Sequence, residues 1–312
     1  MDNFTDKIAV VTGGGSGIGR ELVRQLARDG CNVATCDVIE KNLEQTLEQV
    51  RSECPDIRLS GHHCDVGVEE DIKRFESEVR DSHDTSHINL LFNNAGIGGG
   101  GSFVNDSREN WERTFNICWN GVYWTLRAFL PMLKACDEGH VVNVSSVNGF
   151  WASLGPGTAH TAYSAAKFAV KGFSEALLTD FRINAPHLGV SVVMPGHIGT
   201  SIAINSQLIM SRKTKVEFSS EQIDFWRDRL IEAGMPVHNE SDDQIVERIV
   251  ERGNSFRDNA PTSAAQAATT ILDAVRENRW RVLVGDDAHR LDERVRKVPE
   301  KAYDFEFFSV FE

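Results

Sequence analysis

The sequence predicts a doubly wound α/β fold, in which helices cover both faces of one parallel β-sheet. Three observations predict it. Short apolar runs rich in valine alternate with amphipathic helical stretches, a glycine-rich turn follows the first run, and polar residues end several of the runs. Asp37, Asp65 and Asn93 stand at such ends. Because ligands of these sheets bind beyond the carboxyl ends of the strands, a binding site is expected there.

The first third of the chain is expected to repeat strand and helix in strict order. Strands are expected near 7–12, 32–37, 57–65 and 88–93, and helices near 17–29, 40–53 and 69–82. Right-handed crossovers between such strands place the helices on both faces of the sheet.

The rest of the chain continues this pattern around one insertion. Residues 1–200 are interpreted as the core of a single domain spanning 1–312, and residues 201–261 as a helical insertion over the substrate site. Residues 262–312 would supply the last helix, the last strand and an aromatic tail at 303–311, which is expected to dock on another surface or subunit. The expected elements are helices at 108–134, 162–184, 220–233, 242–252 and 263–278, and strands at 140–145, 190–194 and 280–285.

Composition argues against a nucleic-acid-binding, metal-binding, disulfide-rich or membrane protein. The chain carries 46 acidic against 33 basic residues, a formal net charge of −13, which disfavours a nucleic-acid partner. Its 6 cysteines contain no Cys-x-x-Cys pair, so neither a disulfide framework nor a metal site is expected. No signal-peptide layout and no long apolar run is visible, so we expect a cytoplasmic protein without a membrane partner.

A glycine-rich turn joins the first strand to the first helix, where backbone N–H groups and the helix dipole can hold a pyrophosphate. A merely flexible turn is the alternative, which the strand–helix context disfavours. Asp37 ends the second strand, as expected of a carboxylate that binds the adenosine ribose, although it could be an ordinary surface residue. No basic residue follows it at Val38, which favours NAD over NADP. The turn residues expected to contact the cofactor are Gly13, Ser16, Gly17, Ile18 and Gly19.

A tyrosine and a lysine stand one helical turn apart at Tyr163 and Lys167. An ammonium beside a phenol favours the phenolate and lowers the pKa of the phenol, which makes a usable general base. Ser146 follows an expected strand and can hydrogen-bond the substrate oxygen, with Ser145 as the neighbouring alternative. Isolated Tyr-x-x-x-Lys spacings are common, so the pair has weight only with the other motifs.

These motifs, with Asn93-Asn94-Ala95-Gly96, resemble the short-chain dehydrogenase/reductase family over about Asp6 to Ile202. The resemblance implies a Rossmann-type fold, catalysis by Ser146, Tyr163 and Lys167, and a homodimer or homotetramer. Ser146 is preferred because the family uses the second serine of such a pair. Further cofactor contacts implied by the resemblance are Asp65 and Val66 at the adenine, Asn93, Ala95 and Gly96 along the cofactor, Tyr163 and Lys167, and Pro195, Ile198 and Thr200 at the nicotinamide.

The chain departs from the family pattern in two places. Cys118 occupies the position of a helix asparagine that completes the proton relay. A thiol donates weakly, so the relay would run through a backbone carbonyl and water, or through Asn116 or Asn120. The stretch 147–161 is also longer than usual; it is either a wall of the substrate pocket or a surface loop.

Together these features predict an NAD-dependent oxidoreductase that interconverts a bulky apolar secondary alcohol and its ketone. An NAD-binding sensor without turnover and a non-redox lyase or dehydratase are the alternatives. The expected size of the substrate comes from apolar residues of the long stretch and of the insertion: Phe150, Trp151, Leu154, Ile202, Ile204, Leu208, Ile209 and Met210.

Overall fold

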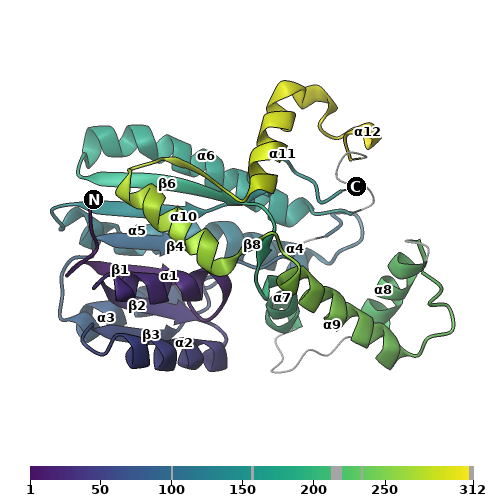
Figure 1. Ribbon diagram of the computed structural model, residues 1–312, viewed down its shortest axis with the longest axis horizontal. Coiled ribbons are helices and arrows are strands. Elements are labelled where there is room, and N and C mark those ends of the chain that lie inside the picture. Colours follow the sequence, from purple (N-terminus) through teal and green to yellow (C-terminus); the bar gives the residue numbers. More distant parts are fainter. Residues whose placement is uncertain (100, 156–157, 212–219, 233–234, 309–312) are drawn as a thin grey trace.

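The computed structural model describes residues 1–312 except 100, 156–157, 212–219, 233–234 and 309–312. The described residues form a seven-stranded sheet in the order β3-β2-β1-β4-β5-β6-β9, and every neighbouring pair is parallel (Figure 1). Its strands are β1 Ile8–Thr12, β2 Asn32–Asp37, β3 Leu59–His63, β4 Leu90–Asn93, β5 Gly139–Val144, β6 Leu188–Pro195 and β9 Arg281–Val284.

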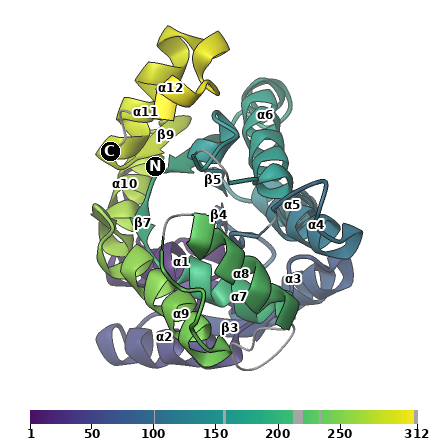
Figure 2. The same ribbon diagram turned by 90° about the vertical axis from the view of Figure 1, so that its right-hand side faces the viewer.

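The direction of winding reverses between β1 and β4, which makes this the switch point of a doubly wound sheet. Helices cover both faces, as Figure 2 shows end-on. One face carries α1 Gly17–Arg28, α2 Glu40–Glu53 and α10 Ala264–Arg276; the other carries α3 Glu69–His83, α5 Gly121–Lys134 and α6 Thr161–Asn184. The predicted fold class is confirmed.

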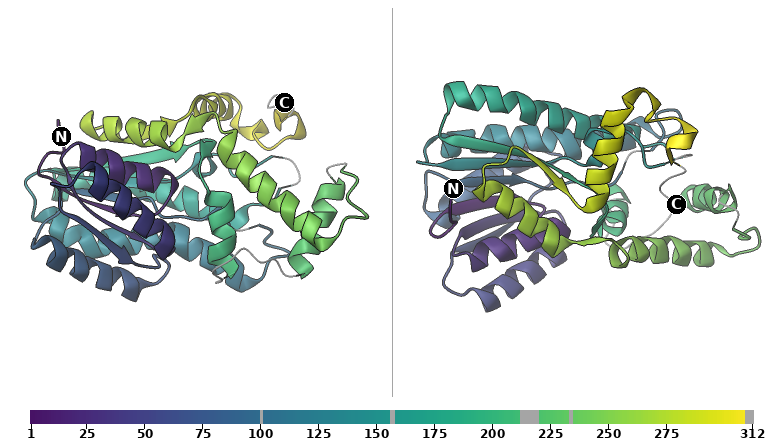
Figure 3. Two further views of the ribbon diagram at one scale, coloured as in Figure 1. Left: turned by 60° about the horizontal axis from the view of Figure 1, so that its bottom comes forward. Right: turned by 45° about the horizontal axis from the view of Figure 1, so that its top comes forward.

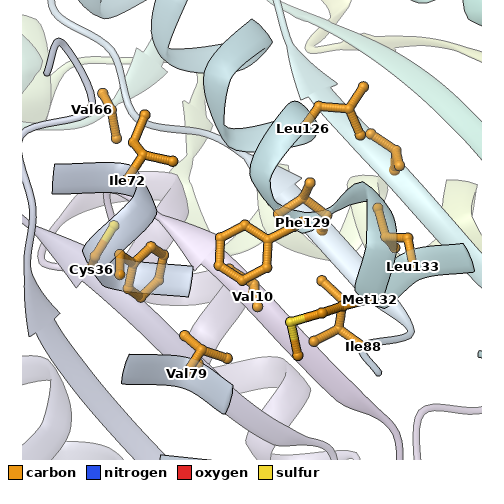
Figure 4. Close-up of a cluster of buried hydrophobic side chains, with 14 of the residues drawn as sticks. Val10, Cys36, Val66, Ile72, Val79, Ile88, Leu126, Phe129, Met132 and Leu133 are labelled. Atoms are coloured by element: carbon orange, nitrogen blue, oxygen red, sulfur yellow. The ribbon is translucent and has the colours of Figure 1, made fainter. Parts of the chain in front are cut away.

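The central strand β1 shows why the apolar runs are continuous rather than alternating. Ile8 and Val10 belong to one hydrophobic core, whereas Ala9 and Val11 belong to the other. Figure 4 shows Val10 beside Phe129 of α5 in the first core. A parallel strand that is buried on both faces needs apolar residues at every position.

A π-helical turn interrupts the long helix that was expected over 108–134. It divides α4 Arg108–Phe115 from α5 at Asn116–Asn120, with Cys118 at its centre. A π-turn inserts one extra residue without changing the apolar periodicity enough to be recognised in the sequence, and such turns recur at functional sites.

The C-terminal third contains more helix than expected. Within the described part of the insertion there are three helices, where two were predicted: α7 Ile202–Ser211, α8 Ser220–Glu232 and α9 Asp242–Asp258. Residue 233, the predicted end of α8, lies outside the described residues. Helix α9 continues past its predicted end at 252. Gly253 lies within it and packs closely on Ile204, where a Cβ would lie 2.8 Å from the Ile204 side chain. Elements not predicted are β7 Ile198–Gly199, β8 Thr262–Ser263, η2 Val147–Gly149, α11 Asp286–Lys297, η3 Pro299–Lys301 and α12 Phe305–Phe308.

A buried histidine makes the stability of this sheet depend on pH. His140 of β5 is 3% exposed, contacts Ser191 through Nε2 at 2.8 Å, and has its pKa lowered by burial to about 4. The unfolded chain therefore binds a proton between pH 6.5 and 4 that the folded chain does not, and stability is lost as pH falls through this window.

We expect this group to lower the free energy of unfolding by about 2 kcal/mol between pH 7 and pH 5. Urea unfolding of the wild type and of His140→Gln at both pH values measures the contribution. The variant should lose correspondingly less stability on acidification, whatever its stability at pH 7. Equal losses in the two proteins would contradict the assignment.

Candidate active site

A cavity of about 910 Å³ lies beyond the carboxyl ends of the strands. Asp37, Ser145 and Pro195, which stand at or just after the ends of β2, β5 and β6, line it, and α7, α9 and α11 contribute side chains to it. Figure 3 shows these three helices gathered beyond that end of the sheet. The predicted site residues that line the cavity are Gly13, Ser16, Gly17, Ile18, Asp37, Val66, Ala95, Gly96, Ser146, Tyr163, Lys167, Pro195, Ile198 and Thr200.

Three predicted site residues do not line the cavity and make internal contacts instead. A Cβ at Gly19 would lie 2.0 Å from the carbonyl oxygen of Gly13, so this glycine lets the first helix pack on the turn. The Asp65 carboxylate accepts from Gly67 N at 2.9 Å and pairs with Arg113 at 3.3 Å. Asn93 Nδ2 donates to Asn143 Oδ1 at 2.8 Å, which links β4 to β5.

The glycine turn leaves its backbone open toward the cavity. Gly13 and Gly17 have φ angles of +70° and +53°, a region that side chains disfavour. A Cβ on Gly17 would also lie 2.9 Å from Thr200, so the turn lies close to the segment after β6. Asn94 holds the turn by donating from Nδ2 to the Thr12 carbonyl at 3.0 Å, a contact that the sequence did not reveal.

Asp37 is fixed at the end of β2 by two backbone donors. Its carboxylate accepts from Gly15 N and from Ile39 N, each at 2.9 Å. Burial raises the pKa of this carboxyl group, and the backbone N–H donors act against that rise. The residues that follow it along the cavity wall, Val38 and Ile39, carry no charge. Arg20, the nearest guanidinium along this part of the chain, donates to Gly15 O at 2.5 Å and to Thr46 at 2.9 Å.

Tyr163 and Lys167 lie in the first two turns of α6 and face the cavity. Lys167 Nζ donates to the carbonyl of Val144 at 2.9 Å and lies 5.4 Å from the centre of the Tyr163 ring. The Ser146 side chain lies close enough to the phenol to lower its pKa. These contacts bring a hydroxyl, a phenol and an amine to one point at the end of β5.

Burial is the largest influence on the pKa values of Tyr163 and Lys167. It raises the pKa of Tyr163, and the neighbouring Ser146 side chain partly opposes that rise. Burial also lowers the pKa of Lys167. The lowering of the tyrosine pKa that the sequence suggested is therefore opposed by desolvation, which disfavours every charged form in the cavity.

The structure distinguishes the two candidate serines. Ser145 Oγ donates to the Lys167 carbonyl at 2.7 Å and so joins β5 to α6. Ser146 Oγ accepts from Asn148 N at 3.1 Å, which leaves its own proton to donate to the phenol or to a substrate oxygen. This geometry supports Ser146 as the residue that touches the substrate.

Cys118 lies deep beneath the cavity wall. Its Sγ donates to the carbonyl of Ile97 at 3.4 Å, and burial raises the pKa of the thiol. A protonated, fully buried thiol is a poor nucleophile. Asn116 and Asn120 are hydrogen-bonded to each other at 2.7 Å, and neither lines the cavity. These contacts favour a relay through backbone and water over one through either asparagine.

Many of the residues that line the cavity are apolar. Trp151 and Leu154 of the long stretch line it, whereas Phe150 does not and packs in the cluster of Trp151. Of the insertion residues singled out in the sequence, Ile202 and Ile209 line it. Lining residues that sequence reasoning missed include Asn94, His160, Ala203, Asn205, Phe256, Asp287 and Leu291.

Comparison with known proteins decides the family. A family model described as short chain dehydrogenase matches residues 7–208. The chain belongs to the short-chain dehydrogenase/reductase family. This short-chain dehydrogenase/reductase is 30% identical over 292 residues to the Mycobacterium tuberculosis protein SadH, covering 94% of this chain and 91% of SadH. It is 32% identical over 201 residues to human epidermal retinol dehydrogenase 2, covering 64% and 63% of the two chains.

Solved structures of short-chain dehydrogenases/reductases share the fold of this chain. A family member from Burkholderia phymatum in complex with NAD superposes with a TM-score of 0.77 at 25% identity, covering 96% of each chain. A metagenomic short-chain oxidoreductase in complex with NADP matches with a TM-score of 0.54 at 28% identity, covering 62% of this chain and 83% of its own. The family therefore includes members bound to either nicotinamide cofactor.

The described part of this short-chain dehydrogenase/reductase shows no helix with both the length and the apolarity to cross a bilayer. Nor do its described His, Cys, Asp and Glu side chains form any group of three that could hold a metal ion.

Proposed function

We propose that the protein is an NAD-dependent oxidoreductase that interconverts a bulky apolar secondary alcohol and its ketone. The observation that carries this proposal is that a single cavity is lined by Asp37 and the glycine turn as well as by Ser146, Tyr163 and Lys167. A dinucleotide site and a proton-transfer site that share one cavity suit hydride transfer to or from a bound alcohol or ketone.

The walls fit NAD as the cofactor. The turn at Gly13 and Gly17 has no room for side chains and can hold a pyrophosphate on its N–H groups. Asp37 retains acceptor capacity for ribose hydroxyls, and its charge would repel the 2′-phosphate of NADP. Ile198 and Thr200, which line the same cavity, would hold the nicotinamide carboxamide.

The chemistry of the chain's own residues then follows. NAD held by the glycine turn and Asp37 would supply the hydride acceptor for the alcohol carbon. Ser146 would donate a hydrogen bond to the alcohol oxygen and hold it beside Tyr163, whose phenolate takes the hydroxyl proton. Lys167, held by the Val144 carbonyl, would stabilise that phenolate with its positive charge. In ketone reduction the phenol returns the proton to the oxygen.

The apolar lining supports a bulky substrate. Trp151, Ile209 and Leu291 come from three separate segments, and their side chains offer contact area but no charge. A human relative is named for retinol, a large apolar alcohol, which also supports this size class.

Turnover with a series of secondary alcohols of increasing size, each with NAD and with NADP, tests the proposal. We expect formation of reduced cofactor with NAD, with kcat/KM rising from small to bulky apolar alcohols. Cofactor binding without oxidation of any alcohol would favour a sensor. Conversion of a substrate with no change in the absorbance of the cofactor would favour lyase or dehydratase chemistry.

The role of Asp37 in cofactor choice can be tested separately. Asp37→Asn removes the charge but keeps the shape of the side chain and part of its acceptor capacity. We expect the ratio of kcat/KM for NAD to that for NADP to fall by about 10²-fold, because a hydrogen-bonded buried charge is lost. Asp56→Asn, a substitution at an exposed position, is the matched control. An unchanged ratio in Asp37→Asn would contradict the assignment.

We also propose that the protein is a cytoplasmic homodimer or homotetramer. The outer surfaces of α5 and α6 expose Tyr123 and Phe168, each 41% exposed, and these helices are the expected subunit interface. The free cysteines of the described chain suit a reducing compartment. Sedimentation of the wild type gives the oligomeric state, and a monomer at micromolar concentration would contradict this part of the proposal.

A further inference from the structure

The chain that follows β9 packs against the loop that follows the catalytic serine. Residues Asp286–Phe308, which we call the C-terminal clasp, form α11, η3 and α12. They lie beside the end of the sheet that bears the cavity (Figures 1 and 3). The sequence suggested that the aromatic tail docks on another surface. The structure shows its described part against the chain's own loop, and residues 309–311 lie outside the described residues.

Trp151 is the centre of this contact. Its Nε1 donates to the carbonyl of Ala302 at 2.7 Å, and the two residues are 7% and 1% exposed. The Phe307 ring lies 5.8 Å from the indole. Next to it, Ala152 N donates to the Tyr303 hydroxyl at 3.0 Å. The clasp therefore fixes both the ring plane of Trp151 and the backbone beside it.

The same loop is tied to the catalytic serine from within. Asn148 Nδ2 donates to the carbonyls of Trp151 at 3.1 Å and Ser153 at 2.8 Å. The backbone N–H of Asn148 donates to Ser146 Oγ. A continuous series of hydrogen bonds thus runs from Ala302 through Trp151 to the serine that faces the substrate.

The start of the clasp contacts the opposite side of the cavity. Asp287 Oδ2 accepts from His197 N at 2.6 Å, within the segment after β6 that is expected to hold the nicotinamide. Leu291, one turn further along α11, lines the cavity and packs in one cluster with Trp151 and Phe307. Helix α11 therefore spans the distance between the cofactor segment and the Trp151 wall.

We propose that the C-terminal clasp determines specificity for bulky alcohols by holding Trp151 and Leu291 as one fixed wall of the substrate site. This inference rests on the proposed function. A wall that is already ordered costs little entropy when a large substrate packs against it, whereas a loosely held loop would have to be ordered on binding. Small alcohols need only Ser146 and Tyr163, so they gain little from the wall.

Two substitutions in the clasp test this, because neither residue lines the cavity. Phe307→Ala removes the ring that packs on Trp151, and Tyr303→Phe removes only the acceptor for Ala152 N. We expect KM for bulky alcohols to rise about tenfold in Phe307→Ala and about threefold in Tyr303→Phe. For small secondary alcohols, both KM and kcat should change less than about twofold. The Kd for NADH should also change less than about twofold. Phe103→Ala, the same chemical change as Phe307→Ala at a ring that is 74% exposed and outside the cavity, is the control and should match the wild type.

An increase of KM that is independent of substrate size, or no increase for bulky alcohols, would overturn the proposal. Amide hydrogen exchange gives a readout that does not need turnover. Exchange in residues 147–155 should accelerate in Phe307→Ala while exchange in β1 and α1 stays unchanged. If the wild type oxidises no alcohol, the proposed function fails. Unchanged exchange at 147–155 instead means that the clasp does not hold the loop, whether or not the protein turns over.

Discussion

Tyr163→Phe is expected to lower kcat for alcohol oxidation by about 10³-fold, because it removes the group that takes the substrate proton. Only the phenolic oxygen is lost, and with it the influence of Ser146 on its protonation. The ring itself packs on His160, with 4.6 Å between the ring centres, and phenylalanine preserves this contact. The Kd for NADH should therefore change little.

Steady-state turnover with NAD, together with NADH binding measured by fluorescence, checks this expectation. Tyr303→Phe, which makes the same change away from the cavity, should retain wild-type kcat for small secondary alcohols. Loss of NADH binding in Tyr163→Phe would indicate a damaged site, and Tyr163→His, which restores a titratable group, would then show whether proton transfer is involved. Turnover that is unaffected by removing the phenol would exclude it as the acid or base.

Lys167→Met is expected to lower kcat at neutral pH by about 10²-fold. Burial raises the pKa of Tyr163, so the phenolate depends on the charge of the amine beside it. Methionine keeps a long apolar chain but removes this charge, and it leaves the buried Val144 carbonyl without its donor. The pKa of the phenol should then rise further.

The pH dependence of kcat/KM distinguishes this role from a purely structural one. Oxidation requires the phenolate, so the rate rises with pH through the pKa of the tyrosine. In Lys167→Met that rise should move to higher pH, and part of the lost activity should return under alkaline conditions. Lys171→Met, one turn further along α6 and outside the cavity, is the matched control. A profile of unchanged position in Lys167→Met would contradict the electrostatic role.

The early strands and helices could be predicted because their signals are local. The bounds expected for β2 and α2, 32–37 and 40–53, agree with the structure. Both elements have an apolar pattern that fits one type of structure. The π-turn at Asn116–Asn120 could not be read in this way, since a single inserted residue disturbs the helical period too little.

Site residues that belong to a local sequence motif could be predicted. Contacts between segments that are distant in the sequence could not. Tyr163, Lys167 and Ser146 lie together at the cavity as expected. The contact between Asp287 and His197 joins positions 90 residues apart and has no local signature. Gly19 was expected at the cofactor because of its place in the glycine pattern, but the structure places it against the Gly13 carbonyl. Packing requires a glycine at some positions and a ligand requires it at others, and the sequence does not distinguish these two causes.

The most direct test of the account is to measure reduced cofactor and ketone together when the wild type acts on a bulky apolar secondary alcohol with NAD. The account predicts one NADH formed for each ketone, with loss of both products in Tyr163→Phe. Ketone or any other product formed without NADH, or NADH binding with neither product under any of these conditions, would contradict it.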